Sequence, residues 1–406
     1  MEKNKNVPKL RFPEFTGEWE EKKLGEITEK IIYGMNAAAT SYDGQNKYLR
    51  ITDIDESSRS FTPKPLTSPD GLIEDKYRLS EGDLVFARTG ASVGKSYLYN
   101  KSDGNLYFAG FLIRFTILNE NPYFIYAQTL KESFNKWVQL MSMRSGQPGI
   151  NAEEYKTLPI FLPSFPEQTK IESFLTAVDE KLTQLKKKKT LLEQYKKGIM
   201  QKLFSQELRF KDNNNQDFPD WQEKTLGEIS DVRDGTHESP QYYDYGFPFI
   251  TSKNLLKDGN IDFDNVSYIN EHDFNRFNFR SKVDVNDILF AMIGTIGNPV
   301  LVSKDGFAIK NVALIKEKGN LLNIFLIHYM KGPSINQQFF EQNTGGTQKF
   351  LSLSVIKNLI VAVPSLPEQQ KIATFLSSID EKISHSSAQI EKMETWKKGL
   401  LQQMFV

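Results

Sequence analysis

The stretch Pro163-Ser-Phe-Pro-Glu-Gln-Thr-Lys-Ile171 decides the fold, because the chain repeats it as Pro364-Ser-Leu-Pro-Glu-Gln-Gln-Lys-Ile372. The match continues downstream without a gap: Asp179-Glu-Lys181 corresponds to Asp380-Glu-Lys382, and Tyr195-Lys-Lys-Gly198 corresponds to Trp396-Lys-Lys-Gly399. Self-similarity in one register over about forty residues indicates a duplicated structural unit. The rest of the chain is therefore best understood as two related halves.

Each copy of the repeat predicts a long helix. A proline disfavours the α region for the residue before it, so the Pro-x-x-Pro motif marks where each helix begins. Apolar residues then recur at heptad spacing, which is typical of a seam for another helix. The seam residues are Ile171, Val178, Leu185, Leu192 and Ile199 in the first copy, and Ile372, Ile379, Ile383, Ile390, Met393 and Leu400 in the second. We expect two helices of roughly 50 Å each that bury their seams against each other.

A globular part precedes each helix, and the two parts correspond more loosely than the helices do. Runs typical of buried strands recur in the same order, and a helix is predicted near the end of each part. The paired segments are Trp19–Ile27 with Trp221–Ile229, Lys47–Thr52 with Phe247–Thr251, Gly82–Ala87 with Asn286–Ala291, and helices around Tyr123–Asn135 and Leu321–Lys331. The sequence thus predicts an α+β chain with a pseudo-two-fold internal repeat. Two mixed α/β domains (residues 1–160 and 211–362) alternate with helices (161–210 and 363–406).

Length and composition limit the possible functions. A chain of 406 residues is too long for one core. It has no cysteine, which excludes disulfides, thiol catalysis and cysteine-based zinc sites. The formal net charge is zero, which argues against a DNA-binding protein that works alone. We find no apolar run that could span a bilayer and no signal peptide, so we expect a cytoplasmic protein without a membrane partner.

Three motifs resemble catalytic or metal sites without meeting their requirements. Gly90-Ala-Ser-Val-Gly94-Lys95-Ser96 is one residue short of a phosphate-binding loop, so we expect a tight connection between strands. Asn121-Pro-Tyr123 lacks one proline of the amino-methyltransferase motif. The four histidines (His237, His272, His328 and His385) have no metal-ligand spacing. We therefore expect no catalytic residue, metal or cofactor in this chain, although an enzyme with an unrecognised site stays an alternative.

Polar loop residues at corresponding places in both halves are candidates for DNA contacts. Asparagine, glutamine and arginine can read base edges, and lysine, serine and threonine suit phosphates. The candidates are Tyr33, Asn36, Arg88, Lys95, Arg144 and Gln147 in the first half, and Arg233, Thr236, His237, Gln241, Lys253, Asn254, Arg276, Arg280, Lys310, Asn311, Gln348 and Lys349 in the second. For any one of them, an ordinary surface loop residue is the alternative. A non-catalytic coiled-coil scaffold with two ligand-binding heads also stays open.

The chain resembles the specificity subunit of a type I restriction–modification enzyme. The resemblance is carried by the repeated motif that starts at Leu162 and Val363, by Asp234-Gly-Thr-His237, by Gly246–Asn254 and by Gly346-Thr-Gln-Lys349. In the first half, Gly34-Met-Asn36 and Ser145-Gly-Gln-Pro148 stand where the second half has Gly-Thr-His and Gly-Thr-Gln-Lys.

The resemblance implies that each globular part reads one half of a split double-stranded DNA target. It also implies that the helices pair antiparallel, fix the unread spacer and dock two methyltransferase (modification) subunits. Restriction subunits, which translocate and cut DNA, join that core. S-adenosylmethionine, ATP and magnesium would then be bound by these partners. The target bases and the spacer length do not follow from the sequence.

Overall fold

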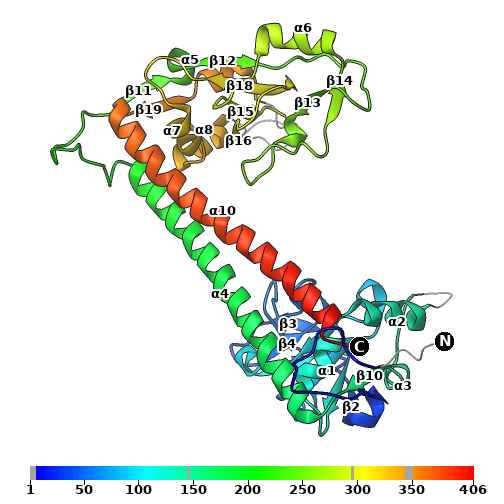
Figure 1. Cartoon of the computed structure of the whole chain (residues 1–406). Helices are drawn as coiled ribbons and strands as arrows, with labels where there is room; N and C mark the ends of the chain where they lie inside the picture. Colours follow the sequence, from blue (N-terminus) through cyan, green and yellow to red (C-terminus); the bar gives the residue numbers. More distant parts are fainter. Residues whose placement is uncertain (1–5, 144–146, 294–296, 343–350) are drawn as a thin grey trace. The chain divides into compact units, whose positions relative to one another are not determined.

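The computed structural model describes the chain except residues 1–5, 144–146, 294–296 and 343–350 (Figure 1). The chain divides into two compact units. Unit 1 holds residues 1–186 and 388–406, and unit 2 holds residues 187–387. The boundary runs through both long helices, so each unit contains one globular part and a portion of each helix.

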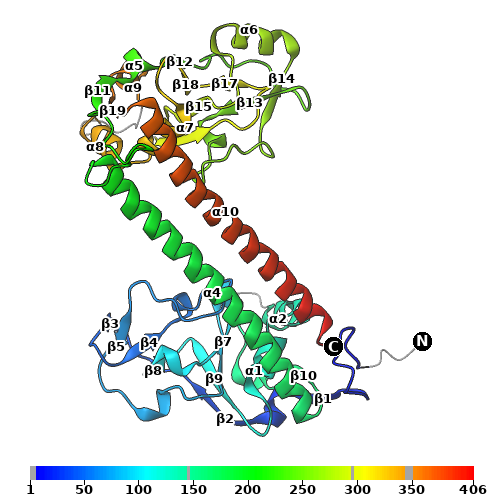
Figure 2. The ribbon, with the colours of Figure 1, turned by 60° about the vertical axis from the view of Figure 1, so that its left-hand side comes forward.

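The two repeated segments form the long helices α4 (Phe165–Phe204) and α10 (Leu366–Gln403). In unit 1, Lys397 near the end of α10 contacts Asp179 near the start of α4. In unit 2, Lys196 near the end of α4 contacts Asp380 near the start of α10. An early residue of one helix thus meets a late residue of the other in each unit, so the pairing is antiparallel, as predicted (Figure 2).

The predicted seam is removed from water along both helices. Six of its residues are buried and five are half-buried: the former are Ile171, Val178, Leu185, Ile372, Ile379 and Leu400, and the latter are Leu192, Ile199, Ile383, Ile390 and Met393. Ser386 interrupts the apolar column and is nevertheless fully buried. Its hydroxyl donates to the carbonyl of Lys382 at 2.8 Å, so the polar group is satisfied within the helix.

The Pro-Glu-Gln motif fixes the start of each helix to its own globular part. Glu167 accepts two hydrogen bonds of 2.8 Å from the guanidinium of Arg11, and Glu368 accepts the equivalent pair from Arg209. Gln168 donates to the carbonyl of Pro163 and accepts from the amide of Asn121, both at 3.0 Å. A buried carboxylate is stable only when it is paired, which explains why the motif occurs with an arginine in both halves.

Unit 1 contains a four-stranded antiparallel sheet in the order β2-β9-β6-β7 and three two-stranded sheets, β1-β10, β3-β5 and β4-β8. Its other elements are β1 (Glu20–Lys23), β2 (Thr28–Tyr33), β3 (Ala39–Ser41), β4 (Lys47–Leu49), β5 (Thr67–Pro69), β6 (Asp83–Ala87), β7 (Ser96–Leu98), β8 (Leu106–Phe108), β9 (Leu112–Ile117), α1 (Pro122–Gln128), α2 (Glu132–Ser142), α3 (Ala152–Tyr155) and β10 (Pro159–Leu162). The predicted tight connection is confirmed, since the 3₁₀ turn Gly90–Ser92 joins β6 to β7.

Unit 2 repeats this topology with its own additions. The order β12-β18-β15-β16 matches β2-β9-β6-β7, the parallel pair β13-β17 matches β4-β8, and β11-β19 matches β1-β10. The elements are β11 (Gln222–Thr225), α5 (Leu226–Ile229), β12 (Asp231–Asp234), β13 (Phe247–Thr251), β14 (Ser267–Ile269), α6 (Glu271–Ser281), β15 (Ile288–Ala291), β16 (Gly297–Leu301), β17 (Ala308–Lys310), β18 (Val312–Lys316), α7 (Asn323–Met330), α8 (Pro333–Gln342), α9 (Leu353–Lys357) and β19 (Ile360–Val363). The internal repeat is therefore confirmed in the strand order.

One predicted helix is divided in the structure. The segment around residues 123–135 forms α1 and α2, separated at Thr129–Lys131, rather than one helix. Thr129 is buried, and its hydroxyl contacts the carbonyl of Tyr126 at 2.6 Å and the hydroxyl of Ser96 at 2.7 Å. These side-chain contacts hold the chain in a turn, which helical periodicity alone does not reveal.

Each globular core is completed by the end of the other half's long helix. In unit 1, the Phe405 ring lies 6.0 Å from Trp19 and 5.0 Å from Phe124, measured between centroids. In unit 2, Phe204 lies 6.2 Å from Phe325 and 5.2 Å from Tyr329. Such aromatic contacts contribute beyond the burial of area alone. Within the described residues, none of the helices has the length and apolar content to cross a membrane.

Candidate nucleic-acid interface

A glycine at the same place in both units brings a candidate loop against the edge of its domain. Gly34 follows β2 and Gly235 follows β12. A Cβ built at Gly34 would overlap the carbonyl of Ala109, and one at Gly235 would overlap the carbonyl of Ile309. Only glycine allows this approach of two backbones. The residues that follow, including Asn36 and His237, are thereby placed at corresponding positions.

In unit 2, the loop after Gly235 meets the turn between β17 and β18. Thr236 forms a backbone bridge with Lys310. The His237 ring lies between two side chains, with Nε2 3.0 Å from an oxygen of Asp234 and Nδ1 2.6 Å from Oδ1 of Asn311. The structure thus joins five residues from two distant segments, Asp234, Thr236 and His237 with Lys310 and Asn311, into one polar cluster, which we call the Thr236–Asn311 cluster.

Two arginines of α6 connect that helix to the same loop. Arg280 forms an ion pair with Asp234, and Arg276 lies 2.8 Å from Glu238. Asp234 therefore accepts from both Arg280 and His237, while its own side chain is largely buried. A buried carboxylate between two donors holds both of them in fixed orientations. Arg276, Arg280, Thr236, His237, Lys310 and Asn311 consequently form one continuous polar surface.

In unit 1, the corresponding surface is built around an aromatic ring. The guanidinium of Arg88 lies over the Tyr33 ring at 5.2 Å from its centroid. The Tyr33 hydroxyl accepts a hydrogen bond of 3.0 Å from the amide of Ala152. Asn36, Gln147 and Phe111 are exposed; Gln147 lies next to Gly90, and Phe111 is in the turn before β9. The two units therefore present different side chains from the same backbone frame.

Comparison with known proteins identifies this frame. The family model for the type I restriction modification DNA specificity domain matches residues 16–194 and again residues 219–395. The chain belongs to this family. It contains two specificity domains, one per matched range, and each combines a globular part with the adjoining portion of a long helix.

Relatives of the same family cover almost the whole chain. The protein assigned as the type I restriction enzyme MjaX specificity subunit of Methanocaldococcus jannaschii is 26% identical over 98% of this chain and 95% of its own length. The type I restriction enzyme MjaVIII specificity subunit of the same organism is 23% identical over 98% of this chain and 93% of its own length.

Solved structures share the fold. The S subunit of a type I restriction-modification system from M. genitalium superposes with a TM-score of 0.62 at 17% identity, covering 98% of this chain and 99% of that one. A chain from a study of complex assembly and conformational transition of the type I R-M system gives 0.54 at 16% identity, covering 95% and 97%.

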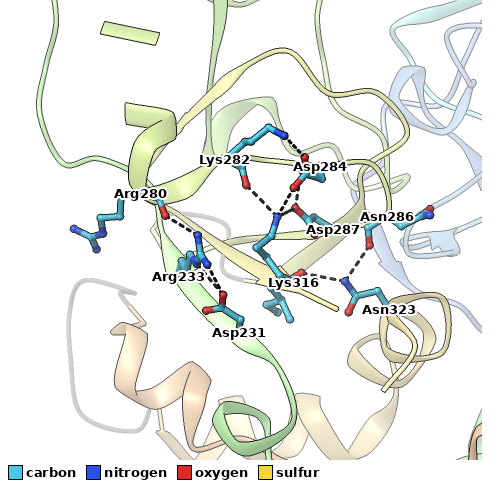
Figure 3. A network of polar contacts seen from close by, with 10 residues as sticks. Asp231, Arg233, Arg280, Lys282, Asp284, Asn286, Asp287, Lys316 and Asn323 are labelled. Atoms are coloured by element: carbon cyan, nitrogen blue, oxygen red, sulfur yellow. Dashed lines mark hydrogen bonds and ion pairs between the residues drawn. The ribbon is translucent and has the colours of Figure 1, made fainter. Parts of the chain in front are cut away.

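Several predicted contact residues of this specificity protein have structural partners. Arg233 donates to Asp231 at 2.6 Å and to the carbonyl of Arg280 at 3.0 Å (Figure 3). Asn254 is buried, accepts from the amide of Thr251 at 2.9 Å and donates to the carbonyl of Asn265 at 3.0 Å. Asn254 is thus held inside the domain, whereas the Arg233 side chain stays 39% exposed.

Lys95 differs from the exposed candidates in being buried. Its ammonium donates to the carbonyl of Ile54 at 3.2 Å and lies 2.5 Å from Glu56. Lys95 therefore links the turn after β6 to the loop that contains Ile54 and Glu56. Lys253 and Gln241 are exposed in the second specificity domain. Arg144, Gln348 and Lys349 lie outside the described residues.

Sequence reasoning did not single out three residues that organise or extend this surface. Asp234 holds Arg280 and His237, Glu238 pairs with Arg276, and Phe279 is 94% exposed on α6. Asp234 is the first residue of the Asp-Gly-Thr-His motif, so a carboxylate directly before the loop glycine was an available signal. Phe279 follows Phe274 and Phe277 in the same helix, and composition alone does not tell the packed rings from the exposed one.

Proposed function

We propose that this chain is the DNA-sequence specificity subunit of a type I restriction–modification complex, and that each specificity domain reads one half of a bipartite double-stranded DNA target. The observation that carries the proposal is one backbone frame with two different sets of loop side chains. Gly34 and Gly235 occupy equivalent positions, but the next two residues are Met35 and Asn36 in the first domain and Thr236 and His237 in the second. Met35 is buried, whereas Asn36 and His237 are exposed at the second position of each loop. Two domains that share a backbone arrangement but differ in their loop side chains are suited to a DNA target whose two halves differ in sequence.

The long helices are proposed to set the unread spacer and to dock two methyltransferase subunits, with restriction subunits joining that core. Support comes from α4 and α10 each being continuous from one compact unit into the other. A continuous helix rises about 1.5 Å per residue, so its length translates directly into distance along DNA. The zero net charge fits this division, because partners can supply phosphate contacts that dominate affinity. The partners would also bind S-adenosylmethionine, ATP and magnesium, and the complex would act in the cytoplasm.

Sequencing of modified bases tests this function. A strain that carries the chain with its partner subunits is expected to show a methylated two-part motif that disappears when this gene is deleted. Replacing residues 230–360 with those of another family member should change one half of the motif and leave the other half intact. A methylated pattern indifferent to deletion of this chain would refute the proposal.

Two further measurements separate the alternative functions. A coiled-coil scaffold with heads for other ligands would select no sequence from a random duplex pool, even with its partners present. Turnover by the purified chain alone would instead indicate an enzyme with its own active site.

The proposed role of the helices in setting the spacer can be tested by lengthening them. Because the helices pair antiparallel, both must be lengthened at facing positions. One heptad should be inserted after Lys189 in α4 and another after Ser386 in α10, so that both helices lengthen together. The motif is expected to keep both half-sequences and to gain unread base pairs between them. Altered half-sequences around an unchanged spacer would show that the helices do not act as the ruler.

A further inference from the structure

Helix α6 distinguishes the second specificity domain from the first. Strand β14 leads into this helix of eleven residues (Glu271–Ser281), whereas the equivalent β5 leads only to a 3₁₀ turn at Asp75–Tyr77 within the described part of unit 1. The four-stranded sheets and the parallel strand pairs of the two domains correspond, although β5 pairs with β3 where β14 pairs with β13. Since the shared frame folds without such a helix in the first domain, α6 is not needed for the frame itself.

The inner face of α6 is fixed by aromatic stacking. The Phe274 ring lies 4.0 Å from Phe247 and the Phe277 ring lies 5.6 Å from Phe249, both between centroids in stacked geometry. Phe277 and Phe249 are buried in a small cluster of their own together with Ile269 and Ala308. The helix is therefore held firmly on strand β13, with its opposite face directed to solvent.

Both ends of α6 are also fixed. At its start, the Asn270 side chain accepts a hydrogen bond of 2.8 Å from the amide of Asp273. At its end, Arg233 donates to the carbonyl of Arg280 at 3.0 Å, and Lys316 donates to the carbonyl of Lys282 at 3.1 Å (Figure 3). Cations at the C-terminus satisfy free carbonyls and complement the helix dipole. Arg233 and Lys316 thus make α6 a rigid element, as precise recognition requires.

The outer face of α6 carries exposed side chains, and of these Arg276 also lies over the Phe277 ring at 4.6 Å from its centroid. His272, Asn275, Arg276 and Phe279 are exposed, and their spacing places them on one side of the helix. Phe279 is 94% exposed, so water surrounds an aromatic ring that contributes nothing to the core. Single exposed apolar residues are common, but here the ring adjoins an amide and a guanidinium on one rigid face.

The position of the outer face of α6 indicates that double-stranded DNA binds there. Arg276 contacts Glu238 and Arg280 contacts Asp234, so α6 directly adjoins the Thr236–Asn311 cluster. The major groove of B-DNA is about 12 Å wide and admits an α-helix. In that groove, asparagine pairs with adenine, arginine with guanine, and phenylalanine contacts the thymine methyl group.

We propose that α6 is the recognition helix of the second specificity domain, with Asn275, Arg276 and Phe279 reading bases in the major groove of the second half-target. The Phe279 ring contacts a thymine methyl group. Arg276 exchanges its contact with Glu238 for a guanine edge when DNA binds. This inference rests on the proposed function, and it adds a reading element that the first domain does not share.

The test uses the full chain in complex with its methyltransferase partners. A duplex library with the second half randomised is selected by the wild type, by Phe279→Ala and by Asn275→Ala. Leu140→Ala is the matched control, because Leu140 is 67% exposed on helix α2 of the first domain. Phe279→Ala is expected to lose about tenfold in affinity and preference at one thymine, with the first half-target unchanged. Its unfolding temperature should equal that of the wild type, because the ring is exposed.

Deoxyuridine provides a second readout, since it lacks only the methyl group of thymine. Substituting it at the affected position should weaken the wild type and leave Phe279→Ala without further loss. Equal affinities and identical selected sequences for Phe279→Ala, Asn275→Ala and the wild type would overturn the recognition helix while leaving the proposed function intact. A wild-type complex that selects no sequence would instead refute the proposed function, and this inference with it.

Discussion

Lys397 Nζ lies 2.5 Å from Oδ1 of Asp179, and this ion pair has an equivalent in Lys196 and Asp380, also at 2.5 Å. Each long helix supplies an aspartate near its start and a lysine near its end. When two such helices run antiparallel, both bridges form at once. The repeated Asp-Glu-Lys and Lys-Lys-Gly segments therefore encode the direction and register of the pairing, which an apolar heptad column alone does not fix.

A double-mutant cycle on Lys397 and Asp179 should reveal this coupling. Both side chains are partly exposed, at 22% and 35%, so we expect a coupling free energy of about 0.5–1 kcal/mol that decreases as salt is added. Equilibrium unfolding in urea measures it. The pair Lys186 and Glu394 is the control, because its side chains are about half exposed and should couple more weakly. No coupling in the Lys397 pair would show that apolar packing alone sets the register.

Removal of Arg209 should destabilise the second unit strongly. The Glu368 side chain is completely buried, and among the described side chains it would keep only the Trp221 indole, whose Nε1 donates at 3.1 Å. Breaking a buried pair from one side costs about 3–5 kcal/mol, so Arg209→Ala should lower the free energy of unfolding by about that amount. Lys211→Ala is the matched control, since Lys211 is exposed and 3.7 Å from Asp217. Equal losses for the two variants would contradict the anchoring role.

The loop glycines should not tolerate alanine, in contrast to glycines in the long helices. Gly235→Ala would press a methyl group against the Ile309 backbone and displace the following loop, so recognition of the second half-target should be lost while the first is kept. Motif mapping of the modified DNA measures this. Gly198→Ala is the control, because nothing lies within 4 Å of its added Cβ in helix α4. It should raise stability by about 0.5–1 kcal/mol and leave the motif unchanged.

Stability should fall in mild acid because of His328. Burial lowers the pKa of this histidine from 6.5 to about 4, with a further contribution from the Lys196 ammonium and an opposing one from Asp380. The unfolded chain therefore takes up a proton below pH 6.5, whereas the folded chain does so only near pH 4. This stabilising contribution is complete above pH 6.5, declines as pH falls and amounts to roughly 3 kcal/mol in total.

The comparison of His328→Gln with the wild type isolates this effect from carboxylates that titrate in the same range. The difference in unfolding free energy between the two proteins should shrink between pH 6.5 and 4. A constant difference between His328→Gln and the wild type would contradict the lowered pKa.

Much of the architecture follows from the sequence because the chain states it twice. The starts of α4 and α10, strand β13 and the turn at Gly90 lie where the patterns predict them. The interruption at Thr129 was missed, since it depends on contacts with Ser96 and Tyr126. Local periodicity contains no information about such tertiary contacts.

The candidate site was less predictable than the fold. Arg233 and Arg276 look alike as sequence, yet Arg233 caps the end of α6 while Arg276 lies on its exposed face. Which side chain projects from a loop depends on its neighbours in space, and Asp234 gathers two of them from distant segments. Sequence spacing could identify the polar loops, but it could not tell which of their side chains are exposed and which are bonded to other residues of the domain.

The dependence of each core on the far helix has a consequence for biosynthesis. Trp19 and Phe124 are made early, but Phe405, which packs against both, leaves the ribosome only after the entire second domain. Domains usually fold in the order of their synthesis. Here the core of the first domain stays incomplete, with apolar side chains exposed, until Phe405 has been synthesised. Phe204, by contrast, has already been synthesised when the second domain emerges. The half that is translated first is thus the half that matures last, and the nascent chain needs shielding from aggregation during that interval.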